Sequence, residues 1–160
     1  MKPTTTVSSS NPVQALVSGL VGALVLNVVH ETVRHLRPVD APRMDILGER
    51  GLRRLLFKAN APQPDKQSAY VLTLAGDVLS NGLYYSLVGS GRHVWWRGVA
   101  LGLAAGVGGV VLPGPMGLGD GPSNRTSQTK AMTVAWYLLG GVVAAAVSAG
   151  WTRSARATAD

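Results

Sequence analysis

The sequence contains no cysteine and few charged residues. Without cysteine the chain forms no disulfide, and thiolate zinc sites, iron–sulfur clusters and cysteine nucleophiles are excluded. Charged residues make up only 14% of the 160 positions, and they cluster, so that long segments carry none or one. This distribution differs from that of an ordinary soluble domain, in which about a quarter of all residues are charged.

Hydrophobic residues are abundant at 46%, and glycine alone occupies 20 positions. Glycine is more frequent in membrane helices than in soluble ones. The formal net charge of +7 is also compatible with nucleic-acid binding, but that function requires basic and aromatic side chains interleaved on a solvated surface. Here the basic residues lie between apolar segments, so we expect the lipid bilayer as the partner and no nucleic acid.

Four segments are long and apolar enough to be considered as membrane spans, for which about 20 residues are needed. They lack the alternation of a half-buried strand, so we expect helices. The predicted fold is an all-α membrane protein, a four-transmembrane-helix bundle with spans at about 13–33, 68–88, 94–112 and 131–151. These spans form one domain, residues 13–152. Residues 1–12 are predicted to be a mobile tail and residues 153–160 a C-terminal tail.

The basic residues predict an orientation. Ten lie in the first and third loops and five elsewhere, and the more basic side of a membrane protein is usually cytoplasmic. We therefore expect the first and third loops to be cytoplasmic and both termini to lie on the other side. The small size and the Ala/Gly/Arg-rich composition favour a bacterial inner membrane.

The first loop is too long to be a simple turn, and its sequence predicts an interfacial amphipathic helix. On a helical wheel one arc is apolar and consists of Met44, Leu52, Leu55, Leu56 and Ala59. The opposite arc carries the side chains expected to contact anionic lipid headgroups, namely Arg50, Arg53, Arg54 and Lys58. A solvated connector remains the alternative, because Phe57 interrupts the pattern.

Two predicted spans carry polar stripes. On the first span the spacing i, i+3, i+4 and i+7 places four side chains on one helix face: Asn27, His30, Glu31 and Arg34. On the second, the spacing i, i+4 and i+8 does the same for Thr73, Asp77 and Asn81. Asn27 and Asp77 each lie roughly 10–14 Å from the first loop at 1.5 Å per residue, so the two stripes lie at matching depth. Because a carboxylate in lipid is costly, we expect the two stripes to face each other and to form a ligand- or ion-binding cluster.

Within this cluster we expect Asp77 to pair with His30 or Arg34, and Glu31 to pair with Arg34 or Arg37. Asn27 and Asn81 are expected to add hydrogen bonds. A purely structural role is the alternative, since buried polar groups also lock membrane helices together. The segment HETVRH places its histidines five apart, not four as in zinc proteases. We predict no catalytic residue, no metal site and no cofactor, although a metal held by His30, Glu31 and Asp77 stays open.

The last two spans carry small residues at regular spacing, which allow helix backbones to approach closely. The predicted packing residues are Gly98, Gly102 and Gly106 on the third span and Gly141 and Ala145 on the fourth. The partner of the third span is either the fourth span or a second copy of the chain. We therefore expect a homo-oligomer or a subunit of a membrane complex.

Three functions remain after this reading. The first is transport- or channel-type handling of a proton, an ion or a small solute by the polar cluster. The second is a non-catalytic structural or accessory subunit that docks a partner protein. The third is a membrane-embedded enzyme or a metal- or ligand-binding protein, which ranks lowest because no catalytic constellation is recognisable. An enzyme is therefore the less favoured reading.

Overall fold

The computed structural model describes residues 11–157, and all regular structure in that part of the chain is helical. The predicted N-terminal tail falls almost wholly on residues 1–10, which lie outside the described residues, as do residues 158–160. The helices of the described part are α1 Pro12–Leu36, α2 Met44–Lys58, α3 Lys66–Ser86, α4 Val94–Val111, α5 Gly121–Asn124 and α6 Ser127–Ala157. Thus α6 continues into the segment that was predicted to be a C-terminal tail.

The starts of two long helices follow from local capping chemistry. The side-chain oxygen of Asn11 accepts a hydrogen bond from the backbone N–H of Val13 (3.0 Å), and Pro12 occupies the first turn of α1. Asp65 accepts hydrogen bonds from the backbone N–H groups of Gln67 and Ser68 at the start of α3. Such caps satisfy N–H groups that a helix leaves without a partner.

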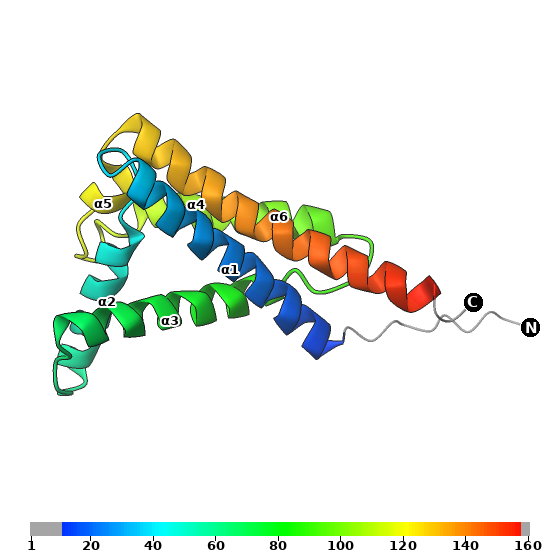
Figure 1. Cartoon of the computed structure of the whole chain (residues 1–160), viewed down its shortest axis with the longest axis horizontal. Helices are drawn as coiled ribbons and strands as arrows, with labels where there is room; N and C mark the ends of the chain where they lie inside the picture. The colour runs from blue at the N-terminus through cyan, green and yellow to red at the C-terminus, as the bar shows by residue number, and fades with distance from the viewer. Residues whose placement is uncertain (1–10, 158–160) are drawn as a thin grey trace, which may run out of the picture.

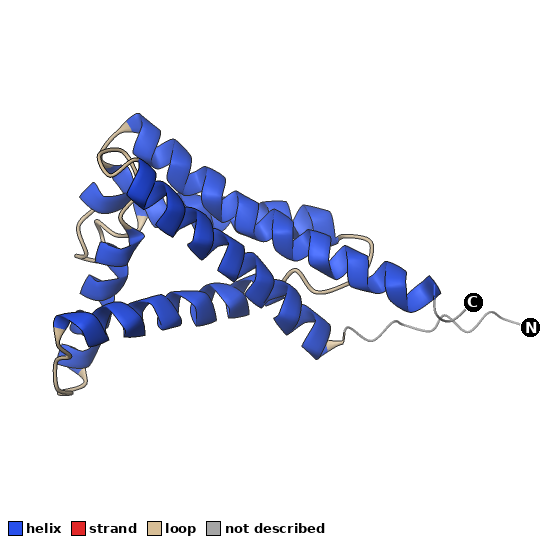
Figure 2. Ribbon diagram, viewed as in Figure 1, coloured by secondary structure: helices blue, strands red, loops and turns tan. Residues whose placement is uncertain are grey.

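Figure 1 shows α1, α4 and α6 lying side by side, with α1 and α4 running toward one end of the molecule and α6 running back. α3 also runs back, meets α1 near the end where α1 begins, and diverges from it toward the other end. α2 crosses between the separated ends of α1 and α3 (Figure 2). We call the end formed by α2, α5 and their loops the wide end, and the end with residues 87–93 the narrow end.

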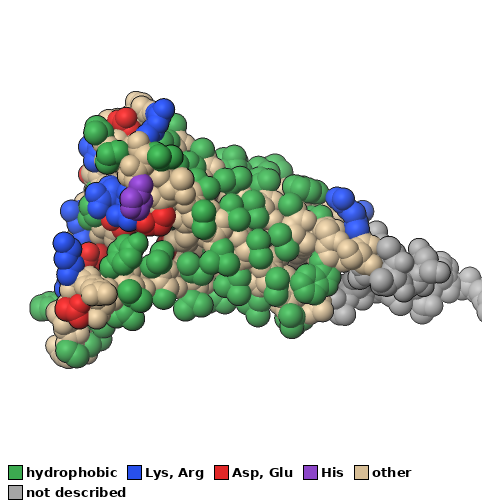
Figure 3. Space-filling view, in the orientation of Figure 1, with side chains coloured by type: hydrophobic (Ala, Val, Ile, Leu, Met, Phe, Trp, Pro, Cys, Tyr) green, Lys and Arg blue, Asp and Glu red, His purple; other side chains and the backbone are tan. Residues whose placement is uncertain are grey.

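The apolar side chains on the outer faces of the long helices are exposed, and the charged groups gather at the wide end (Figure 3). The exposed apolar residues include Val13, Leu16, Leu24 and Val28 on α1, Val71, Leu72, Leu79 and Leu83 on α3, Leu103, Val107 and Val111 on α4, and Leu139 on α6. Soluble monomers rarely expose contiguous apolar surface on this scale. An apolar outer surface is the pattern of a protein embedded in lipid.

Three helices in the described part of the chain are long and apolar enough to cross a membrane: Pro12–Leu36, Val94–Val111 and Ser127–Ser154. The prediction of an all-α membrane protein is confirmed at this level. The second predicted span is a helix of 21 residues, α3. It is not among the candidate spans, because polar residues such as Asp77 and Asn81 lower its mean hydropathy. Four spans are therefore not shown by length and composition alone.

The glycine ridge of α4, formed by Gly98, Gly102 and Gly106, packs against α6. A Cβ atom added to Gly102 would lie 2.7 Å from the Cα of Leu138, and one added to Gly106 would lie 2.7 Å from the Cα of Val134. A Cβ atom at Gly98 would meet the carbonyl oxygen of Gly141 at 2.5 Å and the Cβ of Ala145 at 2.8 Å. Of the two partners that the sequence left open for this ridge, α6 of the same chain is the one that covers it.

The basic side chains of α2 are largely engaged within the protein. Arg50 and Arg54 donate hydrogen bonds to the carbonyl oxygens of Leu118 and Met116, each at 2.6 Å, and Arg53 pairs with Glu49 at 2.9 Å. Lys58 remains exposed. The apolar arc is also incomplete, since Leu55 is 66% exposed. The predicted helix is present, and its residues Arg50 and Arg54 join the first loop to the third by hydrogen bonds.

Candidate functional site

The two polar stripes converge on a cleft bounded by α1, α2 and α3 at the wide end. The cleft has a volume of about 430 Å³, part of it open to the outside. Its lining residues are Asn27, His30, Glu31 and Arg34 from α1, Pro42, Met44 and Asp45 from the first loop and α2, and Tyr70, Thr73, Leu74 and Asp77 from α3. Six of the seven predicted cluster residues are thus brought together.

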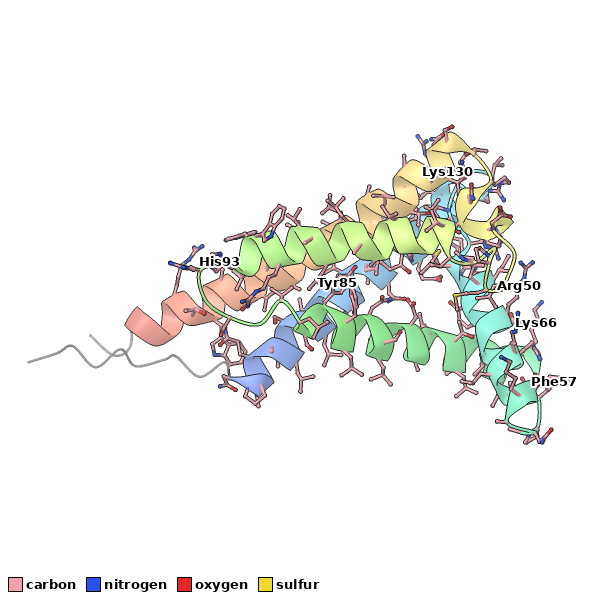
Figure 4. The ribbon with its side chains drawn as sticks, turned by 180° about the vertical axis from the view of Figure 1, so that it is seen from behind. Arg50, Phe57, Lys66, Tyr85, His93 and Lys130 are labelled. Carbon is pink, nitrogen blue, oxygen red and sulfur yellow. The ribbon has the colours of Figure 1, made fainter. Side chains whose placement is uncertain are left out.

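The cleft exists because α1 and α3 touch near the narrow end and separate toward the wide end. Added Cβ atoms show the close approach: at Gly19 one would lie 2.6 Å from the backbone nitrogen of Ser86, and at Gly82 one would lie 2.7 Å from the Leu20 side chain. This crossing closes the cleft toward the narrow end. At the wide end α2 packs on α3, where Gly48 leaves room for the methyl group of Thr73. Figure 4 shows the separation of the two helices from the opposite side.

Charged groups at the mouth of the cleft form a connected network. Arg34 contacts Glu31 one turn earlier on α1 (Nη2–Oε2, 2.5 Å) and lies 3.6 Å from the Asp45 carboxylate on α2. Arg43 pairs with the same carboxylate at 2.8 Å. Partial burial alone would raise the pKa of Asp45, but the hydrogen bond from Arg43 and the charges of Arg43 and Arg34 outweigh it and lower that pKa. The pair between Glu31 and Arg34 is the one expected from the sequence.

Asp77 lies deeper, roughly 16 Å from the start of α3 at 1.5 Å per residue. Its Oδ1 accepts a hydrogen bond from the Asn81 amide (3.0 Å), and the Asn27 amide of α1 is within hydrogen-bonding reach of the same carboxyl group. The predicted pairing of Asp77 with His30 or Arg34 is wrong. Arg34 is drawn to Glu31 and Asp45, while His30 is held by aromatic rings on α6.

His30 is 8% exposed and packs edge-on against Trp136 (ring centroids 4.9 Å apart) and Tyr137 (5.8 Å). Its Nε2 atom is buried without a hydrogen-bond partner among the described residues. The same holds for Nε of Arg34 and Oγ1 of Thr73. All three residues line the cleft. Such unpaired polar atoms are uncommon in folded proteins and mark a place where a further polar group fits.

Sequence reasoning missed part of the lining. Tyr70 lies three residues before Thr73 on the same face of α3, so the i, i+3 spacing of the stripe contained a signal for it. Asp45 gave no such signal, because only the fold of the first loop brings it beside Arg34. Asn81, the seventh predicted residue, does not line the cleft, and its amide donates a hydrogen bond to Asp77, which does.

A metal site is not supported by this geometry. In the described part of the chain no group of three or more His, Asp or Glu side chains is placed to hold a metal ion. The metal site on His30, Glu31 and Asp77 that the sequence left open gains no support from this arrangement. Asp77 is occupied by amide groups, and the Glu31 carboxylate is turned to Arg34.

Comparison with protein-family models, with curated proteins and with solved structures finds no match to this chain. The function is therefore inferred from the geometry of the cleft and from the distribution of polar and apolar side chains.

Proposed function

We propose that this chain is a four-span membrane protein of transport or channel type, which takes a proton, an ion or a small solute into the cleft between α1 and α3. The observation that carries the proposal is the convergence of the polar stripes on one cleft together with three buried polar atoms that have no partner. Intramembrane ionisable side chains are costly and typically line substrate or ion pathways.

Chain direction supports four spans. α1 and α4 both run from the narrow to the wide end (Figure 1), so the chain returns between them, and α3 is the helix that makes this return. Its 21 residues span roughly 31 Å at 1.5 Å per residue, close to the thickness of the hydrocarbon core. Its outer face is apolar, with Val71, Leu79 and Leu83 exposed, while Thr73, Asp77 and Asn81 face inward.

Charge supports the orientation predicted above. The first and third loops lie together at the wide end, joined by hydrogen bonds from Arg50 and Arg54, and together they hold most of the basic residues. In this proposal the wide end faces the cytoplasm of a bacterial cell and α2 lies at the headgroups, with Lys58 free to contact anionic lipid. The cleft then receives its ligand from that side.

The alternative role as a structural or accessory subunit has less support. If the polar residues served to lock helices, their hydrogen bonds would run between helices. Most of the cluster's hydrogen bonds run within one helix: Asn27 donates to the carbonyl oxygen of Ala23, the Asn81 amide donates to Asp77, and Arg34 pairs with Glu31. The contacts between helices are the approach of Asn27 to Asp77 and the 3.6 Å approach of Arg34 to Asp45. An enzyme remains the least supported function, since the sequence contains no recognisable catalytic constellation. A homo-oligomer or a larger complex would have to form through faces other than the glycine ridge.

Flux through proteoliposomes tests the proposal. Three probes are measured: protons with an entrapped pH dye, K⁺ with an entrapped indicator, and glycerol by osmotic swelling. We expect flux of at least one probe above that of protein-free liposomes. Asp77→Leu should reduce it at least tenfold and Asp77→Asn less, because the amide keeps the hydrogen bonds with Asn27 and Asn81.

The matched control is Ser80→Ala on the outer side of the same helix, where the hydroxyl donates a hydrogen bond to the backbone carbonyl oxygen of Asp77. The flux of this variant should equal that of the wild type. No flux for any probe, combined with co-purification of a fixed membrane partner, would favour the accessory subunit instead. Unchanged flux in Asp77→Leu would show that the cluster has no part in transport.

A further inference from the structure

The three unpaired atoms of the cleft restrict what binds there. Nε of Arg34 carries a hydrogen and only donates, so the group that it meets must accept a hydrogen bond. A bare metal cation or an ammonium group fails this requirement. The hydroxyl of Thr73 donates or accepts, and Nε2 of His30 does either according to its tautomer. A ligand group that accepts from Arg34 and exchanges hydrogen bonds with both Thr73 and His30 satisfies all three atoms.

The charges around the cleft exclude an anion as the natural ligand. Arg34 already lies 2.5 Å from the Glu31 carboxylate and 3.6 Å from that of Asp45, while Arg43 pairs with Asp45 at 2.8 Å. The two arginines and two carboxylates at the mouth therefore compensate each other. A phosphate or carboxylate ligand at Nε of Arg34 would add a third negative group to one guanidinium and would face the acidic side chain of Asp77 below it.

We propose that the cleft binds an uncharged hydroxyl-bearing group, held by Arg34, Thr73 and His30. This inference rests on the proposed function and names the class of its ligand. A hydroxyl group both accepts and donates a hydrogen bond, and it brings no charge that the compensated network would have to balance. The walls contributed by Met44, Tyr70 and Leu74 match the carbon skeleton that carries such a group.

Two sources supply this chemistry: a free polyol from water, or the headgroup of a neutral lipid. The surface is hollowed between the charged groups of the wide end and the apolar side chains of α3 (Figure 3). The apolar and aromatic side chains that line the cleft are Pro42, Met44, Tyr70 and Leu74, and of these Tyr70 is 39% exposed. A mouth bordered by apolar side chains on the flank of the molecule favours a membrane-borne ligand such as a diacylglycerol.

Tryptophan fluorescence tests the proposal, because Trp136 packs edge-on against His30, which lines the cleft. The full-length chain is used with Trp95→Phe, Trp96→Phe and Trp151→Phe, and it is reconstituted in phosphatidylcholine vesicles, whose headgroup has no hydroxyl. One arm adds 1,2-dioleoylglycerol to the bilayer, and a second adds glycerol to the buffer. A third adds phosphatidic acid with the same acyl chains, in which phosphate replaces the hydroxyl.

We expect a saturable fluorescence change with dioleoylglycerol, or with glycerol if the natural source is aqueous, and none with phosphatidic acid. Thr73→Val should weaken the response about tenfold, the equivalent of one hydrogen bond. This variant should fold at least as well as the wild type, because it removes a buried hydroxyl that has no partner. Thr32→Val is the control, since the exposed Thr32 hydroxyl bonds the carbonyl oxygen of Val28 on its own helix.

A response to phosphatidic acid as strong as that to dioleoylglycerol would overturn the inference, and so would the absence of a saturable response to both hydroxyl probes. Equal weakening by Thr73→Val and Thr32→Val would also contradict it. Binding is measured without flux, so the two proposals fail separately. Binding of a hydroxyl probe without flux would refute transport and support the ligand class. Flux of protons alone, without binding of a hydroxyl probe, would support transport and refute the ligand class.

Discussion

At the scale of single residues, the wide end is organised by competition for Arg34. Glu31 is one helical turn away and Asp45 approaches from α2, so two carboxylates share one guanidinium. Asp77 is left to its amide partners Asn81 and Asn27. Asp45 is therefore the residue that ties α2 electrostatically to α1, with Arg43 as its nearest cation.

The lowered pKa of Asp45 predicts a pH-dependent stability. The folded state binds the ionised carboxylate through Arg43 and Arg34, so its pKa lies below the ordinary value of 3.8. The stabilisation is complete above 3.8 and is lost as the pH falls from there through the lowered folded value. Asp45→Asn should cost about 1–2 kcal/mol near pH 7, and the difference from the wild type should vanish in strong acid.

Thermal unfolding of the two proteins in mild detergent between pH 7 and pH 2 measures this difference. Asp120→Asn is the control, because exposed Asp120 takes part in no ion pair among the described residues. A difference between wild type and Asp45→Asn that persists unchanged at pH 2 would mean that the carboxylate charge is not its origin.

At the scale of elements, the close contact between α4 and α6 is made by residues without side chains. Gly98, Gly102 and Gly106 bring the backbone of α4 against α6, where Gly141 receives it. Within lipid there is little hydrophobic force between helices, so close packing and dispersion supply the attraction. α4 and α6 therefore form the stable part of the bundle, and α3 is attached to it mainly through α1.

Gly102→Ala should disrupt this contact. The new Cβ would lie 2.7 Å from the Cα of Leu138, which is backbone and does not rotate away. We expect a loss of about 1–3 kcal/mol, the usual cost of overpacking. Gly150→Ala on α6 is the matched control, since no atom lies within 4 Å of its added Cβ. It should be neutral or stabilise by up to about 1 kcal/mol through helix propensity. Equal melting temperatures for both variants would refute the close contact.

α2 is attached to the third loop at two points. Gly117 and Gly119 have positive φ angles of 71° and 78°, which glycine adopts without strain. The carbonyl groups just before them, on Met116 and Leu118, accept hydrogen bonds from Arg54 and Arg50. The turn of the loop thus presents two acceptors to α2.

Replacing both anchors, Arg50→Gln with Arg54→Gln, should loosen the loop at residues 112–120. The shorter side chains lose two charge-assisted hydrogen bonds of roughly 1 kcal/mol each, so amide hydrogen exchange in this loop should become at least fivefold faster. Lys58→Gln, which removes a charge from an exposed position of α2, should leave the exchange unchanged. Equal exchange in the double variant and Lys58→Gln would show that lipid, and not these bonds, orders the loop.

At the scale of the whole molecule, the open question is whether α3 crosses the bilayer. Chain direction and the apolar outer face favour it, although its inward face is polar. The natural absence of cysteine makes single-cysteine labelling unambiguous. We expect Gln63→Cys, before α3, and Ser90→Cys, after it, to react from opposite sides of the membrane, with Gln63→Cys reached only from the cytoplasm.

Labelling in intact cells with a membrane-impermeant maleimide, before and after permeabilisation, distinguishes the two sides. Reaction of both positions from the same side would mean that α3 lies along the surface. Reaction of Gln63→Cys from outside intact cells would reverse the orientation derived from the basic residues.

The sequence by itself determined the features that repeat along one helix. The i, i+3, i+4 spacing of Asn27, His30 and Glu31 identified the face that lines the cleft, and the fourfold spacing of the glycines identified the packing face of α4. These are local properties, because helical periodicity assigns each residue to a face irrespective of what that face contacts.

Only the tertiary structure decided which partner each face has. The sequence left α6 and a second copy as equal partners for the glycine ridge, and it assigned His30 or Arg34 to Asp77. Asp45, which shares the Arg34 guanidinium with Glu31, lies on α2. The position of this loop helix depends on the close crossing of α1 and α3 at Gly19 and Gly82. Pairing between helices follows from crossing geometry and from loop contacts distant in sequence, and neither leaves a periodic signal in the chain.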